Sequence, residues 1–228
     1  MWSGILNLHK PAGITSAAAV GRVKRLLPRG TKVGHAGTLD PFATGVLLVL
    51  VGRATKSCES LMGAVKEYEA TIKLDATTPS LDPETPEAAV AVVTPPTPEA
   101  VLAAMARQIG VIEQMPPTYS ALKINGRRAA DRHRDGETVV LRPRPVRIDA
   151  FDLLDYAWPL ARVHVTCGRG TYVRAIARDL GVALGTGGYL TQLCRTRVGE
   201  YLVGDALTLD GLDAARVEQS LGGQWQAG

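Results

Sequence analysis

The sequence predicts an α+β or mixed α/β protein in which helices flank one mixed sheet. Residues 46–51 form a continuous apolar run of strand length, which is typical of a strand covered on both faces. Residues 66–74 alternate between polar and apolar side chains, which indicates a half-buried strand. Helical segments separate these and further strands along the whole chain, so strands that are distant in sequence must share one sheet.

The N-terminal elements carry clear boundary signals. Residues 3–9 predict a strand, and the Lys-Pro-Ala-Gly sequence at 10–13 predicts the turn that stops it. Thr15 or Ser16 then caps a helix over residues 17–27, whose valines and leucines fall on one stripe.

The middle and second half of the chain alternate irregular and regular segments. Residues 75–98 are rich in proline and acids, which predicts a long irregular excursion rather than a packed element. A helix follows over residues 99–110, and a loop, a basic helical stretch and a strand are expected between 116 and 148. Residues 161–167 alternate as a strand does, and Thr171 is expected to cap the helix that follows it.

Composition bounds the number of domains and the cellular environment. The chain has 228 residues, of which 46% are hydrophobic, enough for one substantial core or two small ones. We expect a single domain, residues 1–228, with a proline-rich insertion at about 75–98. Cys58, Cys167 and Cys194 lie far apart and are odd in number, which favours buried thiols of a cytosolic protein over disulfides. No apolar run is long enough to cross a bilayer, so we expect a soluble, cytoplasmic protein without membrane association.

Basic side chains concentrate in one part of a chain whose formal charge is only +4. Between residues 122 and 147, eight Lys or Arg stand against three acids, a local balance of +5. This distribution suits a polyanion such as nucleic acid, and it suits a solvated, positively charged surface equally well. The eight are Lys123, Arg127, Arg128, Arg132, Arg134, Arg142, Arg144 and Arg147.

One carboxylate, Asp40, stands in the loop GHAGTLDPFATG directly before the apolar run. Pro41 pushes the Asp40 backbone towards extended geometry, and the glycines at 34, 37 and 45 let the chain turn tightly around it. A carboxylate on a stiff loop beside a buried strand is well placed as a nucleophile or general base. The alternative is that Asp40 makes an Asx turn or caps a short helix.

Other chemistries lack their spacing in this sequence. A phosphatase of the haloacid dehalogenase type needs a second Asp two residues after the first, where Phe42 stands. There is no G-x-G-x-x-G for a dinucleotide and no G-x-S-x-G for a serine hydrolase. The histidines are too scattered for a metal site or a zinc deaminase, so we expect no metal. They are His9, His35, His133 and His164.

The stretch GRGTYVRAIARDLG offers partners for a catalytic acid. Tyr172 and Arg174 belong to the first turn of the predicted helix, where the helix dipole favours an anion. An arginine can hold a carboxylate with two charge-assisted hydrogen bonds and keep it ionised in a dry pocket. The alternative is a core aromatic at Tyr172 and a surface arginine at Arg174, and Tyr68, which faces inward on its strand, has the same alternative.

Six segments occur together and in a fixed order. They are SGILNLHKPAGITS, GHAGTLDPFATGVLLVLVGRATK, KEYEATIKL, PPTYSALKINGRR, CGRGTYVRAIARDLG and LCRTRVG. In this order they resemble the bacterial tRNA pseudouridine synthase B family, over about residues 3–198. A single segment would say little, whereas six in order, with G-H-x-G-x-L-D-P-x-A-x-G nearly intact, are highly specific.

The resemblance implies both a fold and a reaction. The fold is the pseudouridine synthase catalytic fold, with a mainly antiparallel sheet flanked by helices. The reaction isomerises the T-loop uridine at tRNA position fifty-five to pseudouridine, with the base flipped out of its stack into a pocket. Asp40 is implied as the catalytic aspartate that initiates cleavage of the glycosidic bond, and no cofactor is needed. Covalent attack by Asp40 and removal of a sugar proton by Asp40 both stay open.

The resemblance also implies roles around the reacting base. Tyr68 stacks on the target base, with proton transfer as a second possible role. Arg174 pairs with Asp40. Tyr172 and Leu193 line the uracil pocket.

Further implied roles concern the loops. His35 helps to hold the RNA loop after the base has left its stack, and Lys10 and Pro11 support the active-site loop. Two positions depart from the family pattern: His9 stands where Asp is usual, and Ala36 where Thr is frequent. Neither takes part in the proposed chemistry.

The segments expected to bind RNA differ more from the family pattern. The proline-rich segment at 79–98 replaces a more regular T-D-T-x-D-x-x-G pattern. Many relatives carry a small C-terminal RNA-binding PUA domain, which we do not expect here. We therefore expect the catalytic domain itself to bind the tRNA T-arm. Contacts to backbone phosphates are expected from Lys123, Arg127, Arg128 and Arg132.

Alternatives from other classes stay open. An enzyme of a guide-RNA particle is disfavoured because it would need extra terminal segments for its protein partners, so we expect a monomer without an obligatory protein partner. A catalytically silent RNA-binding or RNA-folding protein on the same scaffold is disfavoured because Asp40, Tyr68 and Arg174 are all retained. A metal-free hydrolase that uses Asp40 is the third and least favoured of these hypotheses.

Overall fold

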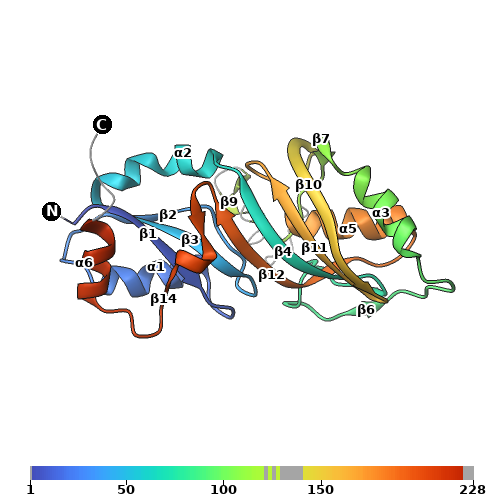
Figure 1. Ribbon diagram of the computed structural model, residues 1–228, viewed down its shortest axis with the longest axis horizontal. Helices are drawn as coiled ribbons and strands as arrows, with labels where there is room; N and C mark the ends of the chain where they lie inside the picture. The colour runs from blue at the N-terminus through green and yellow to red at the C-terminus, as the bar shows by residue number, and fades with distance from the viewer. Residues whose placement is uncertain (1, 121–122, 125–126, 129–140, 223–228) are drawn as a thin grey trace. The chain divides into compact units, whose positions relative to one another are not determined.

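Figure 1 shows the computed structural model, which describes residues 2–120, 123–124, 127–128 and 141–222. Contacts divide the chain into a terminal unit, Met1–Tyr68 with Cys194–Gly228, and a central unit, Glu69–Leu193. Strands β4 (Lys66–Lys73) and β12 (Tyr189–Val198) contain the boundaries, so each belongs to both units. The prediction of one domain over residues 1–228 stays a prediction.

The terminal unit is built around β3, on which other strands pair on both sides. β1 is antiparallel to β3, with Leu6 opposite Val49, and β12 is parallel to β3, with Cys194 opposite Thr44. β14 runs parallel to β1, β2 is antiparallel to β3, and β13 is antiparallel to β12. The elements are β1 (Gly4–Lys10), α1 (Ser16–Arg25), β2 (Val33–Ala36), β3 (Thr44–Val51), η1 (Gly52–Ser57), α2 (Cys58–Gly63), β13 (Tyr201–Leu202), η2 (Val203–Asp205), β14 (Leu207–Thr208) and α6 (Ala214–Gly222).

The apolar run forms β3, and every residue from Gly45 to Val51 is buried. This confirms the prediction of a strand covered on both faces. Partly buried side chains of α2, including Leu61 and Met62, pack against the side chains of one face of the strand. That core cluster consists of Ala36, Val46, Leu48, Leu50 and Val198.

The first helix begins where the sequence predicts. Thr15 is the N-cap of α1, and its Oγ1 accepts a hydrogen bond from Ala18 N at 3.0 Å. Ala19 and Val23 bury the apolar stripe of the helix.

The described residues of the central unit form a second set of strands and two helices. Its strands follow the order β4, β11, β10, β7, and both β10–β11 and β10–β7 are antiparallel. α3 packs against α5 and against β10 (Figure 1). The elements not yet given are β5 (Ala76–Thr77), β6 (Ala88–Ala89), α3 (Pro98–Ala106), β7 (Gly110–Gln114), β8 (Lys123–Ile124), β9 (Arg127–Arg128), β10 (Arg144–Ala157), β11 (Leu160–Cys167) and α5 (Val173–Leu184).

The alternating strands are confirmed. In β4, Lys66, Tyr68, Ala70 and Ile72 are buried and the residues between them are not. β11 alternates in the same way. β1 with β14 and β12 with β3 pair in parallel, whereas most of the other strand pairs whose register is given above are antiparallel. The predicted mixed, mainly antiparallel sheet flanked by helices is therefore confirmed.

Part of the proline-rich segment contradicts the prediction of an unpacked excursion. Thr78, Ser80 and Asp82 are only 3%, 2% and 1% exposed. Polar residues in a proline-rich stretch gave no apolar signal, but their side chains are buried because they hydrogen-bond one another and the neighbouring backbone. Beyond them the chain is mostly exposed, as predicted.

Two smaller predictions are also wrong, and a third is not tested. Thr171 does not cap α5: the N-cap residue is Tyr172, and the amide of Gln114 bonds the backbone of Tyr172 instead. Within the basic stretch, Lys123–Ile124 pairs with Arg127–Arg128 as β8 and β9, and the predicted helical part falls largely on residues 129–140, which lie outside the described residues, so it stays a prediction. Of the three free cysteines only Cys167 is buried.

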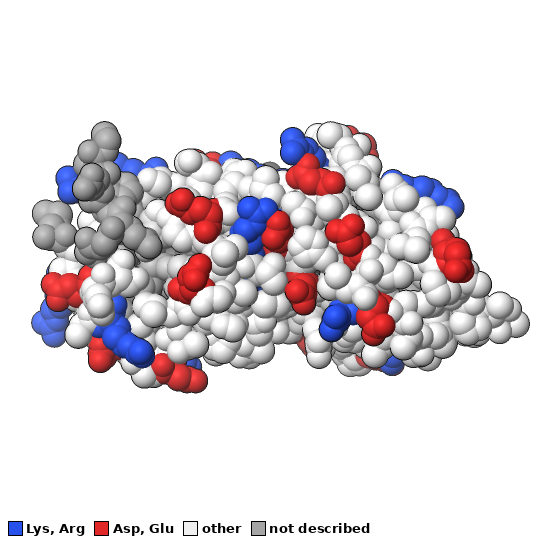
Figure 2. All heavy atoms as spheres, viewed as in Figure 1, with Lys and Arg blue, Asp and Glu red and all other residues white. Residues whose placement is uncertain are grey.

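Charged side chains are mixed on the face of the molecule seen in Figure 2. Lys and Arg are interspersed with Asp and Glu there, so this face presents no continuous basic surface. In the part of the chain that the structure describes, no helix combines the length and the apolar character that crossing a membrane requires.

Candidate active site

Asp40 lies half-buried in the loop between β2 and β3, and the Lys10 side chain bonds the backbone of this loop. The Lys10 side chain is fully buried, and its Nζ donates to the carbonyl oxygens of Pro11 at 2.8 Å, Ile14 at 2.8 Å and Pro41 at 3.1 Å. An ammonium has three donors, and all three are used. The turn after β1 is therefore tied to the residue that follows Asp40.

The residue before Asp40 is fixed as firmly. Ser16 Oγ donates to Leu39 O at 2.9 Å and accepts from Leu39 N at 2.8 Å, and both groups are buried. Gly13 N adds a bond to Pro41 O at 2.9 Å. Both backbone neighbours of Asp40 are thus held by the segment that begins α1.

Arg195 of β12 holds the two ends of the same loop. Its side chain is 1% exposed, and its guanidinium donates to Val46 O at 2.8 Å, Gly37 O at 3.0 Å and Thr38 O at 3.4 Å. At Gly45, where φ is +103°, an added Cβ would lie 2.2 Å from Arg195 O, so only glycine fits. The sequence reasoning missed Arg195, although the segment LCRTRVG was noticed, because nothing local distinguishes a buried arginine from an exposed one.

Several independent hydrogen bonds fix the backbone of the loop around Asp40, which suits a catalytic carboxylate. Three side chains, Lys10, Ser16 and Arg195, fix backbone atoms on both sides of Asp40. Rigid support lets a reactive group keep its geometry without further ordering when substrate binds. His35 is half-buried on β2 and Tyr68 is 7% exposed on β4, both within the terminal unit.

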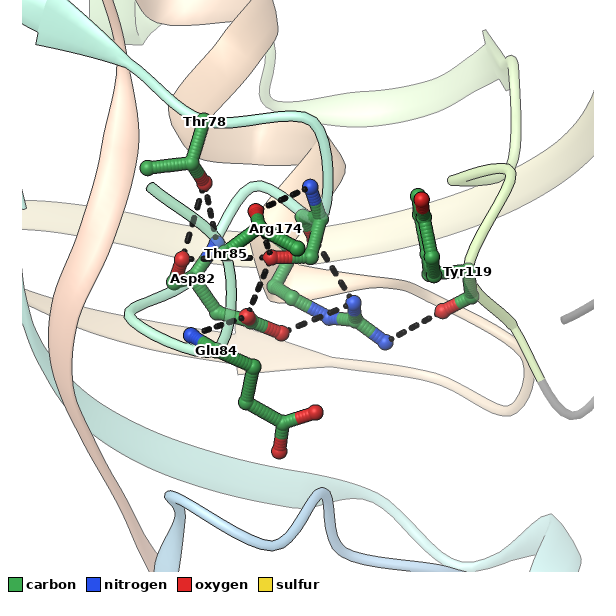
Figure 3. Close-up of polar contacts among 7 residues, drawn as sticks. Thr78, Asp82, Glu84, Thr85, Tyr119 and Arg174 are labelled. Atoms are coloured by element: carbon green, nitrogen blue, oxygen red, sulfur yellow. Dashed lines mark hydrogen bonds and ion pairs between the residues drawn. The ribbon is translucent and has the colours of Figure 1, made fainter. Parts of the chain in front are cut away.

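The central unit contains a second buried polar site around Arg174 of α5. Arg174 is 4% exposed, which excludes the alternative of a surface arginine. Its Nη1 donates to Asp82 Oδ2 at 2.9 Å and to Ser80 O at 2.7 Å, and its Nη2 donates to Tyr119 O at 2.9 Å. Figure 3 shows the guanidinium between these acceptors, with Asp82 on one side and the Tyr119 carbonyl on the other.

Asp82 is itself held by its own loop. Its Oδ1 accepts from Ser80 Oγ at 2.6 Å and from Glu84 N at 3.0 Å, and Thr78 Oγ1 bonds both the N–H and the C=O of Asp82 at 3.0 and 2.8 Å (Figure 3). Leu81, between them, has a φ of +62°, a left-handed conformation that costs a non-glycine residue roughly 1 kcal/mol or more. The hydrogen bonds on either side offset this cost.

The sequence reasoning missed Asp82, which lies in the segment taken for an unpacked excursion. The short Thr-x-Ser-x-Asp spacing at 78–82 is the one local signal that could have drawn attention to it. Its partner Arg174 lies 92 residues further along the chain.

Tyr172 and Leu193 also lie in the central unit. Gln114 Oε1 accepts from Tyr172 N at 2.9 Å and Gln114 Nε2 donates to Tyr172 O at 3.2 Å, which fixes the start of α5. The Arg144 guanidinium lies 5.0 Å from the centre of the Tyr172 ring, a cation–π contact. Leu193 is 7% exposed.

The predicted site residues therefore fall into two groups. Those of the terminal unit are His35, Asp40, Tyr68, Lys10 and Pro11, and those of the central unit are Tyr172, Arg174 and Leu193. The pairing of Asp40 with Arg174 stays a prediction. Of the predicted RNA contacts, Lys123, Arg127 and Arg128 lie in β8 and β9, and Arg132 is outside the described residues.

Comparison with known proteins identifies the family. The family model "TruB family pseudouridylate synthase (N terminal domain)" matches residues 24–173, about two thirds of the chain. The chain belongs to the TruB family. The model "tRNA pseudouridylate synthase B C-terminal domain" matches residues 174–223 as well. The prediction of an isomerase of the pseudouridine synthase class is confirmed.

Relatives of the TruB family match over nearly the whole chain. A protein named tRNA pseudouridine synthase B from Phocaeicola vulgatus is 43% identical over 224 residues, 94% of this chain and 95% of its own. One of the same name from Mycobacterium sp. strain KMS is 47% identical over 224 residues, 96% of this chain and 75% of its own.

Solved structures give the same picture of the fold. A chain of a Cbf5-Nop10-Gar1 complex superposes with a TM-score of 0.71 at 29% identity, covering 92% of this chain and 53% of the solved one. A chain of the archaeal box H/ACA sRNP Nop10-Cbf5 complex has a TM-score of 0.66 at 28% identity, covering 91% of this chain and 51% of the solved one. This chain thus spans about half the length of the solved chains it matches.

Proposed function

We propose that this protein isomerises uridine to pseudouridine in the T-loop of tRNA, at position fifty-five. The observation that carries the proposal is Asp40, held on both backbone sides by Lys10, Ser16 and Arg195. In a chain of the TruB family, a carboxylate supported in this way suits an initiating group. The names of the bacterial relatives support tRNA as the substrate.

The proposed reaction conserves all atoms of the nucleotide. The bond from the sugar C1′ to the uracil N1 breaks, the base turns, and a bond from C1′ to C5 forms. The proton on C5 is then lost and N1 gains one, so no oxidant, reductant or cofactor is consumed. Asp40 starts the sequence, either by attacking covalently or by removing a proton from the sugar.

The other residues bind and orient. We propose that Tyr68 stacks on the flipped base, that Tyr172 and Leu193 line its pocket, and that Arg174 keeps Asp40 ionised. The buried Asp82 fixes the Arg174 guanidinium, which makes Asp82 a positioning residue in this scheme. His35 holds the RNA loop after the base has left its stack.

Binding of the tRNA is proposed to rest on phosphate contacts. Lys123, Arg127, Arg128 and Arg132 supply them from the basic stretch. We infer a monomer that works in the cytoplasm without a metal or an obligatory protein partner. The similar solved structures are instead complexes, one of Nop10 with Cbf5 and one of Cbf5 with Nop10 and Gar1.

The test is tritium release from a tRNA transcript labelled at uracil C5, in the presence of EDTA. Wild-type protein is expected to release tritium, and Asp40→Asn is expected to release none while it still binds tRNA, because the amide keeps the shape of the carboxylate. Asp210→Asn, at an exposed position of the same unit, is the matched control and should behave as wild type.

Two outcomes would contradict the proposal. Substantial release by Asp40→Asn would remove Asp40 from its role. Binding of tRNA without release by any variant would instead favour the catalytically silent RNA-binding protein.

A further inference from the structure

A second basic cluster lies in the terminal unit, between Arg22 and Lys56. This stretch contains seven Lys or Arg and one acid, Asp40, a balance of +6 against +4 for the whole chain, so the remaining residues sum to −2. All seven are exposed, and no ion pair joins any of them to a carboxylate of the described residues. They are Arg22, Lys24, Arg25, Arg29, Lys32, Arg53 and Lys56.

Three segments bring these side chains to one region. Val33 pairs with Val51 at the end of the β2–β3 ladder where β2 begins and β3 ends. Just beyond this end, Gly52 N donates to Lys32 O at 2.8 Å. This places Lys32 beside the start of η1, which carries Arg53 and Lys56. The last turn of α1 carries Arg22, Lys24 and Arg25, and this helix packs along β2. Arg29 lies in the segment that joins α1 to β2.

A hollow of about 550 Å³ lies between these segments. Lys24 and Lys32 line it together with the hydroxyl-bearing Thr31 and Thr55, and no carboxylate is among its described lining residues. Val33, Gly30 and Gly34 complete the lining, and a Cβ added at either glycine would meet nothing within 4 Å. The backbone is therefore open to close approach by a ligand. Thr31 Oγ1 and Thr55 Oγ1 donate to Pro28 O and Gly52 O, so the donors left for a ligand are the two ammonium groups.

Helix electrostatics explains only part of this cluster. Basic side chains in the last turn of a helix are favoured by the helix dipole, which accounts for Arg22, Lys24 and Arg25. It does not account for Lys32 and Arg53, which lie outside the helix on the other walls of the region. Seven exposed cations on neighbouring segments give this region a positive potential that attracts anions.

We propose that this basic hollow binds backbone phosphates of the structured RNA substrate, as a contact surface additional to β8 and β9. The inference rests on the proposed function, since it assumes an RNA substrate. Ammonium groups around an open backbone suit phosphate oxygens, which accept hydrogen bonds and carry negative charge. Such contacts position the RNA without reading its sequence, so the surface adds affinity and not base specificity.

The test is the salt dependence of tRNA binding by the full chain. Each phosphate contact that is lost lowers the slope of log affinity against log salt by about 1. Lys24→Ala/Lys32→Ala is expected to lower the slope by about 2 and to raise KM, with kcat at saturating tRNA unchanged. Arg107→Ala/Arg162→Ala removes two exposed cations outside both basic clusters and should leave the slope as in wild type.

A second variant guards against a folding defect. Arg53→Ala/Lys56→Ala alters another wall of the same region and should lower the slope by a similar amount. Wild-type slopes in both double variants would overturn the inference while leaving the proposed function intact. If the wild-type protein neither binds nor converts tRNA, the proposed function fails and the inference fails with it.

Discussion

Replacing Asp82 by Ala tests how much the buried ion pair between Asp82 and Arg174 contributes to the free energy of unfolding. The substitution removes the carboxylate that accepts from Arg174 Nη1 at 2.9 Å, from Ser80 Oγ at 2.6 Å and from Glu84 N at 3.0 Å. The side chains of the ion pair are only 5% and 1% exposed, so water cannot take the place of the lost acceptor without the loop opening.

The expected cost follows from this burial. Removing one partner of a buried ion pair costs about 3–5 kcal/mol because the other charge stays in a dry environment. Arg174 retains the carbonyl oxygens of Ser80 and Tyr119, which places the expected loss at the lower end, about 3 kcal/mol. In a chain of this length such a loss lowers Tm by about 6–12 °C.

Urea unfolding followed by circular dichroism measures the loss. Asp149→Ala is the matched control, because Asp149 pairs with Arg147 at 2.6 Å but the side chains are 27% and 65% exposed. An exposed pair of this kind contributes at most about 1 kcal/mol. If Asp82→Ala loses no more stability than Asp149→Ala, the reasoning from burial is refuted.

Three further predictions concern the loop and the pH response. Gly45→Ala places a Cβ 2.2 Å from the main chain of β12 at a φ of +103°, so it should lose about 2–5 kcal/mol in urea unfolding, whereas Gly34→Ala, with open space, should lose under about 1. Lys10→Met removes a fully buried ammonium and leaves three carbonyl oxygens without its hydrogen bonds, so the free energy of unfolding should fall by at least about 2 kcal/mol. An unchanged unfolding curve would refute the supporting role of Lys10. Burial and the adjacent Glu87 raise the pKa of Tyr189 to about 12, so ultraviolet titration should find a late phenol that Tyr189→Phe lacks. The stability that the Tyr189 phenol contributes is complete below pH 10 and is lost as pH rises towards 12. If Tyr189→Phe instead removes a phenol that titrates near pH 10, this prediction is wrong.

The sequence by itself determined the elements whose signals are local. The alternation of β4, the apolar run of β3 and the cap at Thr15 each depend on residues a few positions apart, and all three form as predicted. The loop around Asp40 was equally visible, because Gly, Pro and Asp restrict the backbone at their own positions. Six short segments in order were enough to recognise the family.

Only the tertiary structure decided which polar residues are buried. Arg174 with Asp82 joins positions 92 residues apart, and Arg195 reaches Val46 across 149. Hydrophobic periodicity indicates which face of an element turns inward, but a polar side chain is buried only where partners from distant segments satisfy its hydrogen bonds. The proline-rich segment around Asp82 therefore seemed unpacked from its composition, and the same reason hid the role of Gln114 at the start of α5.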